Sequence, residues 1–192
     1  MKLIPTLSFL IPAGLCSIGS LVAENEPADK QRLFDFENAG TAPKWFPVND
    51  GVMGGLSTGL ADIKHGSLHF SGDLSLENYG GFASIRAAGD YDFSGKQKVV
   101  MRIKGDGRTY QLRLATNARY RGSAVSYGAE FATEKARWIE VEIPFESLSP
   151  SWRGTKLDGS PFDASEVAEI GILIGDKKDG RFSLEVDWIA VK

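Results

Sequence analysis

The sequence predicts an all-β protein, a sandwich of two antiparallel sheets with one short helix. Apolar and polar residues alternate in many short segments, which is the two-residue period of a half-buried strand. Glycine, proline and short polar residues separate these segments at close spacing. A chain of 192 residues is long enough for one well-packed domain and short for two. Two layers of strands around one core are the simplest arrangement for so many short strands.

The N-terminal residues 1–23 predict a secretory signal peptide. They have a positive start at Lys2, an apolar middle and the small residue Ala23 at the end. Residues 24–31 are polar and predict a short tether, so the domain itself is expected over 32–192. We therefore expect an exported protein, periplasmic or secreted, with an uncleaved membrane anchor as the alternative.

Composition limits the partners of the exported chain. Its single cysteine, Cys16, lies in the predicted signal peptide, so no intramolecular disulfide is expected after cleavage. The formal net charge of the whole chain is −3. This mild value argues against a nucleic-acid surface and against strong attraction to anionic membranes. We expect a monomer without a cofactor, whose partner is a protein or a glycan.

The alternating segments predict the strands in chain order. The expected strands are 33–37, 67–71, 82–87, 99–104, 110–114, 126–131, 138–143, 169–174 and 181–191. The segment 105–107, Gly-Asp-Gly, predicts a hairpin turn between two of them. In the last strand we expect Trp188 to face the core, and Trp45 and Trp138 are also expected there. The one short helix is expected over 163–168, where Asp163 and Glu166 have the spacing of a capping box.

Two glycine pairs, Gly54-Gly55 and Gly80-Gly81, stand beside short polar residues. Such pairs indicate backbone that turns with positive φ or passes close to another element, so we expect at least one glycine of each pair in such a conformation. Asn49 and Asp50 precede the first pair. Their side chains either cap their own turn or contact a ligand, and the sequence leaves both open.

These motifs together resemble the complex I intermediate-associated protein 30 family. The resemblance rests on the segments 48–57, 80–84, 105–108, 143–145 and 182–185, with Trp45, and covers nearly all of 33–192. It implies a galactose-binding-like jelly-roll sandwich. For mitochondrial members it implies a chaperone-like role in assembling respiratory complex I. We therefore expect a non-enzymatic, protein-binding assembly factor of the cell envelope, with a carbohydrate-binding module of an exported protein as the alternative.

Two loop-like segments, 119–122 and 149–154, carry aromatic and cationic groups together. A ring can stack on a sugar or anchor a protein contact, and an arginine can bind a carboxylate through two hydrogen bonds. The alternative is that these rings only cover the open end of the sandwich. The predicted partner-binding residues are Asn49, Asp50, Arg119, Tyr120, Trp152 and Arg153.

Catalytic and metal sites are less well supported. The segment 55–59 has the spacing of a nucleophile elbow, but strand-like sequence follows it where an elbow requires a helix. We therefore expect no enzyme. Carboxylates on the first and last strands are weak calcium candidates, and the solvated face of a sheet is the preferred interpretation. These candidates are Asp35, Glu37, Glu185 and Asp187.

Overall fold

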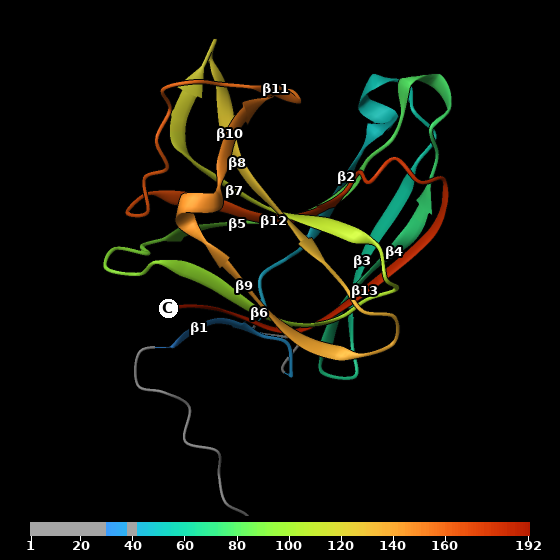
Figure 1. The fold of residues 1–192 in the computed structure, drawn as a ribbon, viewed down its shortest axis with the longest axis horizontal. Coiled ribbons are helices and arrows are strands. Elements are labelled where there is room, and N and C mark those ends of the chain that lie inside the picture. Colours follow the sequence, from blue (N-terminus) through green and yellow to red (C-terminus); the bar gives the residue numbers. More distant parts are fainter. Residues whose placement is uncertain (1–29, 38–41) are drawn as a thin grey trace, which may run out of the picture.

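Two antiparallel β-sheets packed face to face make up the computed structural model of the protein (Figure 1). The structure describes residues 30–37 and 42–192. The predicted signal peptide and nearly all of the tether lie outside these residues. Within the described part of the chain, no helix is long and apolar enough to cross a membrane.

One sheet has six strands in the order β3-β4-β13-β6-β9, with β1 also paired to β13, and the other has seven in the order β11-β10-β8-β7-β12-β5-β2. The strands of the six-stranded sheet are β1 (Gln31–Asp35), β3 (Thr58–Lys64), β4 (Ser67–Leu74), β6 (Lys98–Lys104), β9 (Trp138–Pro144) and β13 (Gly180–Val191). Those of the seven-stranded sheet are β2 (Phe46–Asn49), β5 (Ala83–Tyr91), β7 (Thr109–Tyr120), β8 (Ser123–Ala132), β10 (Ser149–Trp152), β11 (Thr155–Lys156) and β12 (Val167–Ile174). Three 3-10 turns complete the described elements, η1 (Asp50–Met53), η2 (Glu77–Tyr79) and η3 (Phe145–Ser147). The all-β prediction is confirmed.

The core lies between the two sheets and follows the predicted alternation. In β6, Met101 and Ile103 are buried, while Arg102 between them is only partly covered. In β7, Leu112 and Leu114 are buried on either side of the more exposed Arg113. Each sheet therefore has an inner apolar face and an outer polar face, as the two-residue period requires.

The segment 105–107 connects the two sheets and does not form the predicted hairpin. β6 pairs with β13 and β9, whereas β7 pairs with β8 and β12. Arg108, directly after this segment, fixes the crossing: its Nε and Nη2 donate to the carboxylate of Asp176 at 3.1 and 2.6 Å. Its Nη1 also donates to the carbonyl of Gly180 at 3.0 Å, so the crossing from β6 to β7 is tied to the crossing from β12 to β13.

Of the three tryptophans expected in the core, Trp45 packs between the sheets, Trp188 is buried in a separate small cluster with Val100 and Ala190, and Trp138 is only partly buried. Trp45 is buried and packs edge-on against Phe34, with ring centroids 5.7 Å apart. A register shift in β13 between Val186 and Trp188 reverses the alternation, which places Trp188 on the outer side. There it is covered by the ammonium group of Lys30, 3.4 Å from its ring centroid.

The helix predicted over 163–168 is also wrong. Asp163 accepts hydrogen bonds from the backbone N–H and the hydroxyl of Ser165 at 2.9 and 2.7 Å, which closes a turn. β12 begins at Val167, directly after this turn. The capping residue is therefore used in a turn that leads into a strand, because the apolar residues that follow alternate with the period of β12.

Candidate functional site

Asp50 organises two turns at one end of the sandwich, the Asp50 turn pair, which consists of residues 50–57 and 75–82. Its side chain has no exposed surface. One carboxylate oxygen accepts the backbone N–H of Ser57 at 2.9 Å, and the other accepts the hydroxyl of Ser57 at 2.5 Å. The second oxygen also accepts the backbone N–H groups of Gly81 and Phe82 at 2.7 and 3.2 Å. One carboxylate thus holds both glycine-rich segments together.

Each glycine pair contains one residue with positive φ and one residue without room for a side chain. Gly54 has φ +91° and Gly81 has φ +130°, which confirms the predicted positive φ in each pair. A β-carbon at Gly55 would lie 2.4 Å from Cγ of Asp50, and one at Gly80 would lie 2.7 Å from Oδ2 of Asp50. The glycines therefore allow the two turns to close around the carboxylate.

The bonding around Asp50 also fixes its charge. Burial alone would raise the pKa of the carboxyl, but the hydrogen bonds from Ser57, Gly81 and Phe82 together hold that pKa below its ordinary value. The hydroxyl of Ser57 donates to this carboxylate and accepts the backbone N–H of Ser75 at 3.0 Å, so the residue at the centre of the elbow-like segment is a structural one.

Asn49 and Asp50 use their side chains within the protein, which fits the turn-capping alternative that the sequence left open. Asn49 Nδ2 donates to the carbonyl of Gly59 at 3.1 Å. Since Asn49 ends β2 and Gly59 lies in β3, this bond joins the edges of the two sheets. The side chains of both residues point into the protein because their hydrogen-bond partners are there, and neither carboxylate oxygen of Asp50 is available to a ligand.

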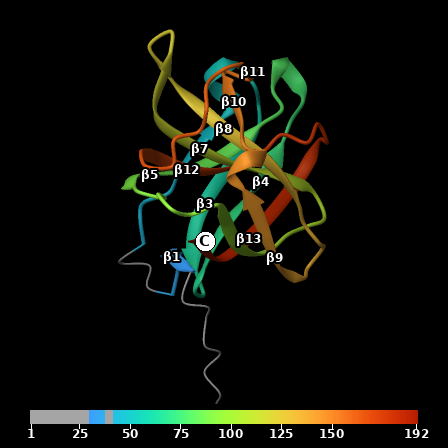
Figure 2. The ribbon, with the colours of Figure 1, turned by 60° about the vertical axis from the view of Figure 1, so that its left-hand side comes forward.

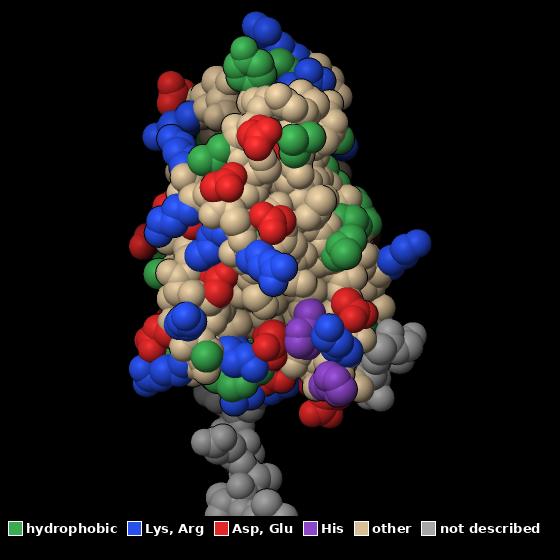
Figure 3. Space-filling view, turned by 90° about the vertical axis from the view of Figure 1, so that its right-hand side faces the viewer, with side chains coloured by type: hydrophobic (Ala, Val, Ile, Leu, Met, Phe, Trp, Pro, Cys, Tyr) green, Lys and Arg blue, Asp and Glu red, His purple; other side chains and the backbone are tan. Residues whose placement is uncertain are grey.

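Apolar side chains are exposed on the tips of the Asp50 turn pair. Tyr79 is 97% exposed, Val52 76% and Met53 62%, and Leu56 and Leu76 are exposed beside them. Figure 3 looks onto this side of the molecule, where hydrophobic side chains lie mostly in the upper half, among charged side chains. These exposed residues were not predicted from the sequence, although isolated apolar residues beside glycine pairs can indicate an exposed apolar patch.

The predicted residues of the other two loops do come together. We call them, with Arg121, the aromatic–arginine rim: Arg119, Tyr120, Arg121, Trp152 and Arg153. The rings of Tyr120 and Trp152 meet edge to face, with centroids 5.5 Å apart. The guanidinium of Arg121 lies 5.5 and 5.7 Å from the two ring centroids, and that of Arg153 lies 5.2 Å from the Trp152 centroid. These are cation–π distances. The β7–β8 hairpin that carries part of the rim projects beyond its neighbours (Figures 1 and 2).

The rim carries positive charge for which the described residues supply no ion pair. Within the described ranges, no carboxylate lies at ion-pair distance from Arg119, Arg121 or Arg153. Arg119 donates to the backbone carbonyls of Thr116 and Ala118 at 3.2 and 3.3 Å. Arginine and aromatic side chains are among the residue types that most often dominate binding energy at protein interfaces.

The outer face of the seven-stranded sheet extends between the rim and the Asp50 turn pair. In Figure 1 the strands at its two edges, β10–β11 and β2, stand higher than the central β12 and β5. Arg113 lies near its centre, where its Nε donates to Ser126 Oγ at 2.9 Å and its Nη1 to Gln111 Oε1 at 3.0 Å. A hollow of about 330 Å³ begins beside Gln111 and is lined also by Thr109, Glu130, Leu173, Lys177 and Lys178. The sequence analysis recognised this alternation but assigned no function to it.

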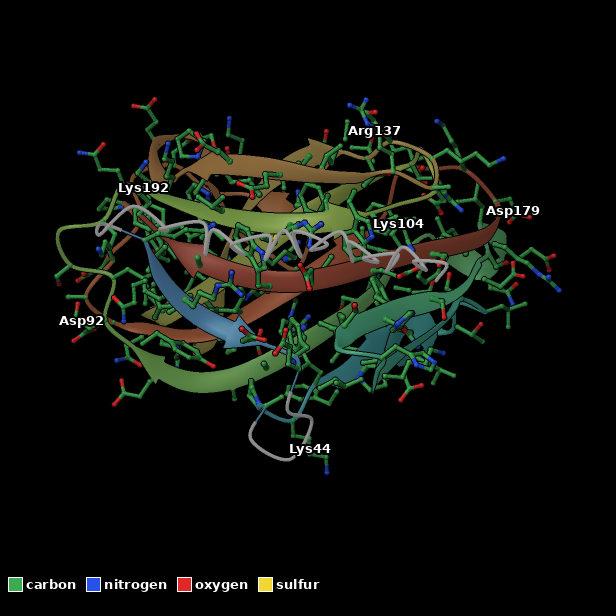
Figure 4. All side chains as sticks on the ribbon, turned by 90° about the horizontal axis from the view of Figure 1, so that it is seen from below. Lys44, Asp92, Lys104, Arg137, Asp179 and Lys192 are labelled. Atoms are coloured by element: carbon green, nitrogen blue, oxygen red, sulfur yellow. The ribbon has the colours of Figure 1, made fainter. Side chains whose placement is uncertain are left out.

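The outer face of the six-stranded sheet is different, because its charges are paired with one another. Lys104 pairs with Glu185 at 2.8 Å, Lys98 with Glu142 at 2.6 Å, and Arg102 with Asp187. Figure 4 looks onto this sheet from below and labels Lys104. Opposite charges on neighbouring strands stabilise the sheet modestly and leave little charge for a partner.

Three of the four calcium candidates form ion pairs with neighbouring basic side chains. Lys104 and Arg102 occupy the carboxylates of Glu185 and Asp187, and Arg32 lies 3.0 Å from that of Asp35. Asp35 also accepts the backbone N–H of Glu37 at 3.2 Å. Among the described residues, no group of three or more histidine, cysteine, aspartate or glutamate side chains is placed to hold a metal ion.

A family profile described as complex I intermediate-associated protein 30, CIA30, matches residues 34–186. The chain belongs to the CIA30 family. This confirms the resemblance, because the matched range contains both glycine pairs and both segments of the rim.

Curated relatives carry the same family name. The chain is 26% identical to the mouse "Complex I intermediate-associated protein 30, mitochondrial" over 181 residues, which cover 83% of this chain and 55% of the mouse protein. It is 24% identical to the Drosophila melanogaster protein of the same name over 86% of this chain and 64% of that protein. The chain thus spans about half to two thirds of their lengths. Because these relatives are named mitochondrial, they contradict the expectation of an exported, periplasmic or secreted protein, which was wrong.

Solved structures with a similar fold are carbohydrate-binding modules and agarases. A family 11 carbohydrate-binding module from Clostridium thermocellum, in complex with a β-1,3-1,4-mixed-linked tetrasaccharide, has a TM-score of 0.64 and 19% identity over 84% of this chain and 94% of that chain. A family 30 carbohydrate-binding module has a TM-score of 0.52 and 13% identity over 84% and 97%. At these identities the likeness supports the jelly-roll sandwich and nothing about ligands.

Proposed function

We propose that this chain is a non-catalytic, protein-binding assembly factor for respiratory complex I. The observation that carries the proposal is the CIA30 family match over residues 34–186. Relatives in mouse and Drosophila melanogaster bear a name that refers to an intermediate of complex I. A non-catalytic role fits the candidate site, because its buried carboxylate, that of Asp50, is used in holding turns together.

The surface that we propose for the protein partner is the aromatic–arginine rim. Its rings are held against each other at 5.5 Å, so they lose little freedom when a partner covers them. Since its arginines form no ion pair with a described carboxylate, they can bind one from a partner without first breaking an ion pair of that kind. An acidic surface on a complex I subunit or intermediate is the complementary chemistry.

The test is co-migration of the tagged full chain with complex I intermediates on native gels, in cells that assemble complex I. We expect the chain to run with intermediates of high mass and not with the finished complex. A variant with Trp152→Ala and Arg153→Ala is expected to run at the mass of the free chain. Migration of the unaltered chain at its own mass under all conditions would contradict the proposal.

Glycan binding is the second candidate, favoured by one observation. The paired rings of Tyr120 and Trp152 adjoin a polar sheet face that carries Gln111 and Arg113, and rings beside hydrogen-bonding side chains are suited to a sugar. A glycan array separates the two candidates. Binding to a defined glycan that Trp152→Ala removes would favour the carbohydrate-binding module, and an array without signal would disfavour it.

A further inference from the structure

The outer face of the seven-stranded sheet holds two arginines that face each other across a glycine. In the strand register, Gly171 of β12 lies opposite Arg86 of β5 on one side and opposite Arg113 of β7 on the other. Residues directly opposite one another share a face, so both guanidiniums start from the same side of the sheet. Two strand spacings separate their backbones, which is roughly 10 Å. No side chain rises from Gly171 between them.

A second glycine, on the other side of Arg113, makes room for the side chain of Gln111. Gly128 of β8 lies opposite Arg113, and a β-carbon there would lie 2.8 Å from Cδ of Gln111. Gln111 therefore lies over the backbone of Gly128, where its Oε1 accepts from Arg113 at 3.0 Å. The guanidinium of Arg113 is held in a fixed position by Gln111 and Ser126, both of which are neutral.

In the described part of the chain Arg113 has no ion pair of its own on this face, although Glu130 lines the neighbouring hollow and the charge of Glu169 partly offsets that of Arg86 at Arg113. Arg86 pairs with Glu169, with Nη1 and Oε1 3.3 Å apart. Burial, followed by the positive charge of Arg86, lowers the pKa of Arg113 below its ordinary value. An arginine that is partly desolvated, beside a second arginine and without an ion-pair partner among the described residues, is better stabilised when an anion binds beside it.

We infer that Arg113 and Arg86 form a carboxylate-binding site above Gly171, which receives an acidic side chain of the protein partner. This identification of the occupant rests on the proposed function, because a protein partner supplies carboxylates from Asp and Glu. A carboxylate matches the forked geometry of a guanidinium and can accept two hydrogen bonds from one arginine or one from each. The unpaired arginines of the nearby rim favour the same acidic partner.

The test uses the full chain and an oligoglutamate peptide capped at both ends, followed through the side-chain Nε–H signal of Arg113 by NMR. We expect this signal to shift and saturate with oligoglutamate and to stay in place with the matching oligoglutamine peptide. Arg113→Gln is expected to weaken binding by about tenfold or more, which corresponds to the loss of charge-assisted hydrogen bonds. Arg86→Gln is expected to weaken it less.

Matched variants separate binding from folding. Arg102 is also an arginine of an outer sheet face, but Asp187 neutralises it, so Arg102→Gln should leave the peptide affinity within about twofold. Arg113→Gln should keep or raise the melting temperature, because it removes a partly buried charge that forms no ion pair with a described residue. Arg113→Lys tests the site with the charge retained, and we expect it to fold and to bind more weakly than arginine because the fork is lost.

Three outcomes would overturn the inference. They are equal binding of oligoglutamine, unchanged affinity in Arg113→Gln, and saturation of the Arg113 signal by inorganic phosphate with no response to oligoglutamate, which would make the site one for free anions. Failure of the proposed function is distinguishable. A chain that binds oligoglutamate at Arg113 but never runs with complex I intermediates would retain the site and lose the assembly role.

Discussion

The Asp50 turn pair and the aromatic–arginine rim lie at opposite sides of the same end of the sandwich, yet they use their polar groups in opposite ways. Asp50 accepts four hydrogen bonds, all from its own chain. The rim holds three arginines for which no ion pair is found in the described residues. Both were predicted as binding residues because both combine polar groups with loops. We infer that internal hydrogen bonding, and not residue type, distinguishes a loop that supports the fold from one that can bind a partner.

The largest effect is expected from removing the carboxylate of the Asp50 turn pair. Asp50→Ala leaves the backbone N–H groups of Ser57, Gly81 and Phe82 buried without acceptors. We expect a loss of about 3 kcal/mol or more in the free energy of unfolding, measured by urea titration. Asp62→Ala is the matched control, because Asp62 is exposed and pairs with exposed Lys64. A similar loss in Asp62→Ala would show that the internal hydrogen bonds of Asp50 contribute nothing special to stability.

The next largest effect is expected where a glycine of the Asp50 turn pair leaves no room for a side chain. A β-carbon at Gly55 would lie 2.4 Å from Cγ of Asp50, whereas nothing lies within 4 Å of one at Gly51. Gly55→Ala should therefore lower the free energy of unfolding by about 1–3 kcal/mol, and Gly51→Ala should change it by less than about 0.5 kcal/mol. Thermal unfolding of the two variants side by side checks this, and equal melting temperatures would show that the packing around Asp50 is looser than described.

The rim should show the reverse pattern. Trp152→Ala combined with Arg153→Ala is expected to weaken partner binding by about 2 kcal/mol, because an aromatic and an arginine anchor are both lost. The melting temperature should hardly change, since the rim makes no ion pair among the described residues. Glu140→Ala combined with Glu142→Ala, on the other sheet, is the control. If that control abolished binding while the rim variant bound normally, the binding surface would lie on the six-stranded sheet.

Acid should unfold the protein partly through Asp50. Its pKa in the folded protein is below its ordinary value, so the stability it contributes is present above the unfolded pKa of about 4 and is lost as pH falls through the folded pKa. Asp50→Asn removes this ionisation, so its free energy of unfolding should depend less on pH below about 4 than that of the unaltered protein. If the free energy of unfolding fell equally with decreasing pH in the two proteins, Asp50 would have an ordinary pKa.

The smallest effect belongs to the charged face of the six-stranded sheet. The pair of Lys98 with Glu142 is largely solvated on the side of Glu142. We expect Glu142→Ala to change the free energy of unfolding by less than about 1 kcal/mol, with the difference shrinking at high salt. A larger or salt-independent loss would mean that this face contributes more to the fold than paired surface charges do.

Much of the fold could be predicted because alternation is a local signal. The buried faces of β6, β7 and the first part of β13 follow directly from it. The inverted position of Trp188 could not be predicted, because the register shift before it depends on pairing with β6. The same holds for the crossing at 105–107, since a short glycine turn looks alike whether the next strand joins the same sheet or the other one.

The candidate site could be predicted only where the residue types within a short segment indicate binding. The rim combines rings and arginines in two short segments, and those segments do meet. Asp50 was assigned to the surface because its partners Gly81 and Phe82 are 31 and 32 residues further along the chain. Arg113 was missed for a related reason: alternation predicted that it faces outward, but only the register shows Arg86 facing it across Gly171.

One urea-unfolding series, which needs no partner, tests whether the Asp50 turn pair supports the fold while the rim does not. It compares the unaltered chain, Asp50→Ala, and the double variant Trp152→Ala with Arg153→Ala. We expect a loss of about 3 kcal/mol or more for Asp50→Ala and a change of about 1 kcal/mol or less for the rim variant, in which the half-buried ring of Trp152 is removed. Equal losses in the two variants, or a larger loss at the rim, would contradict the division of this end of the molecule into a framework side and a binding side.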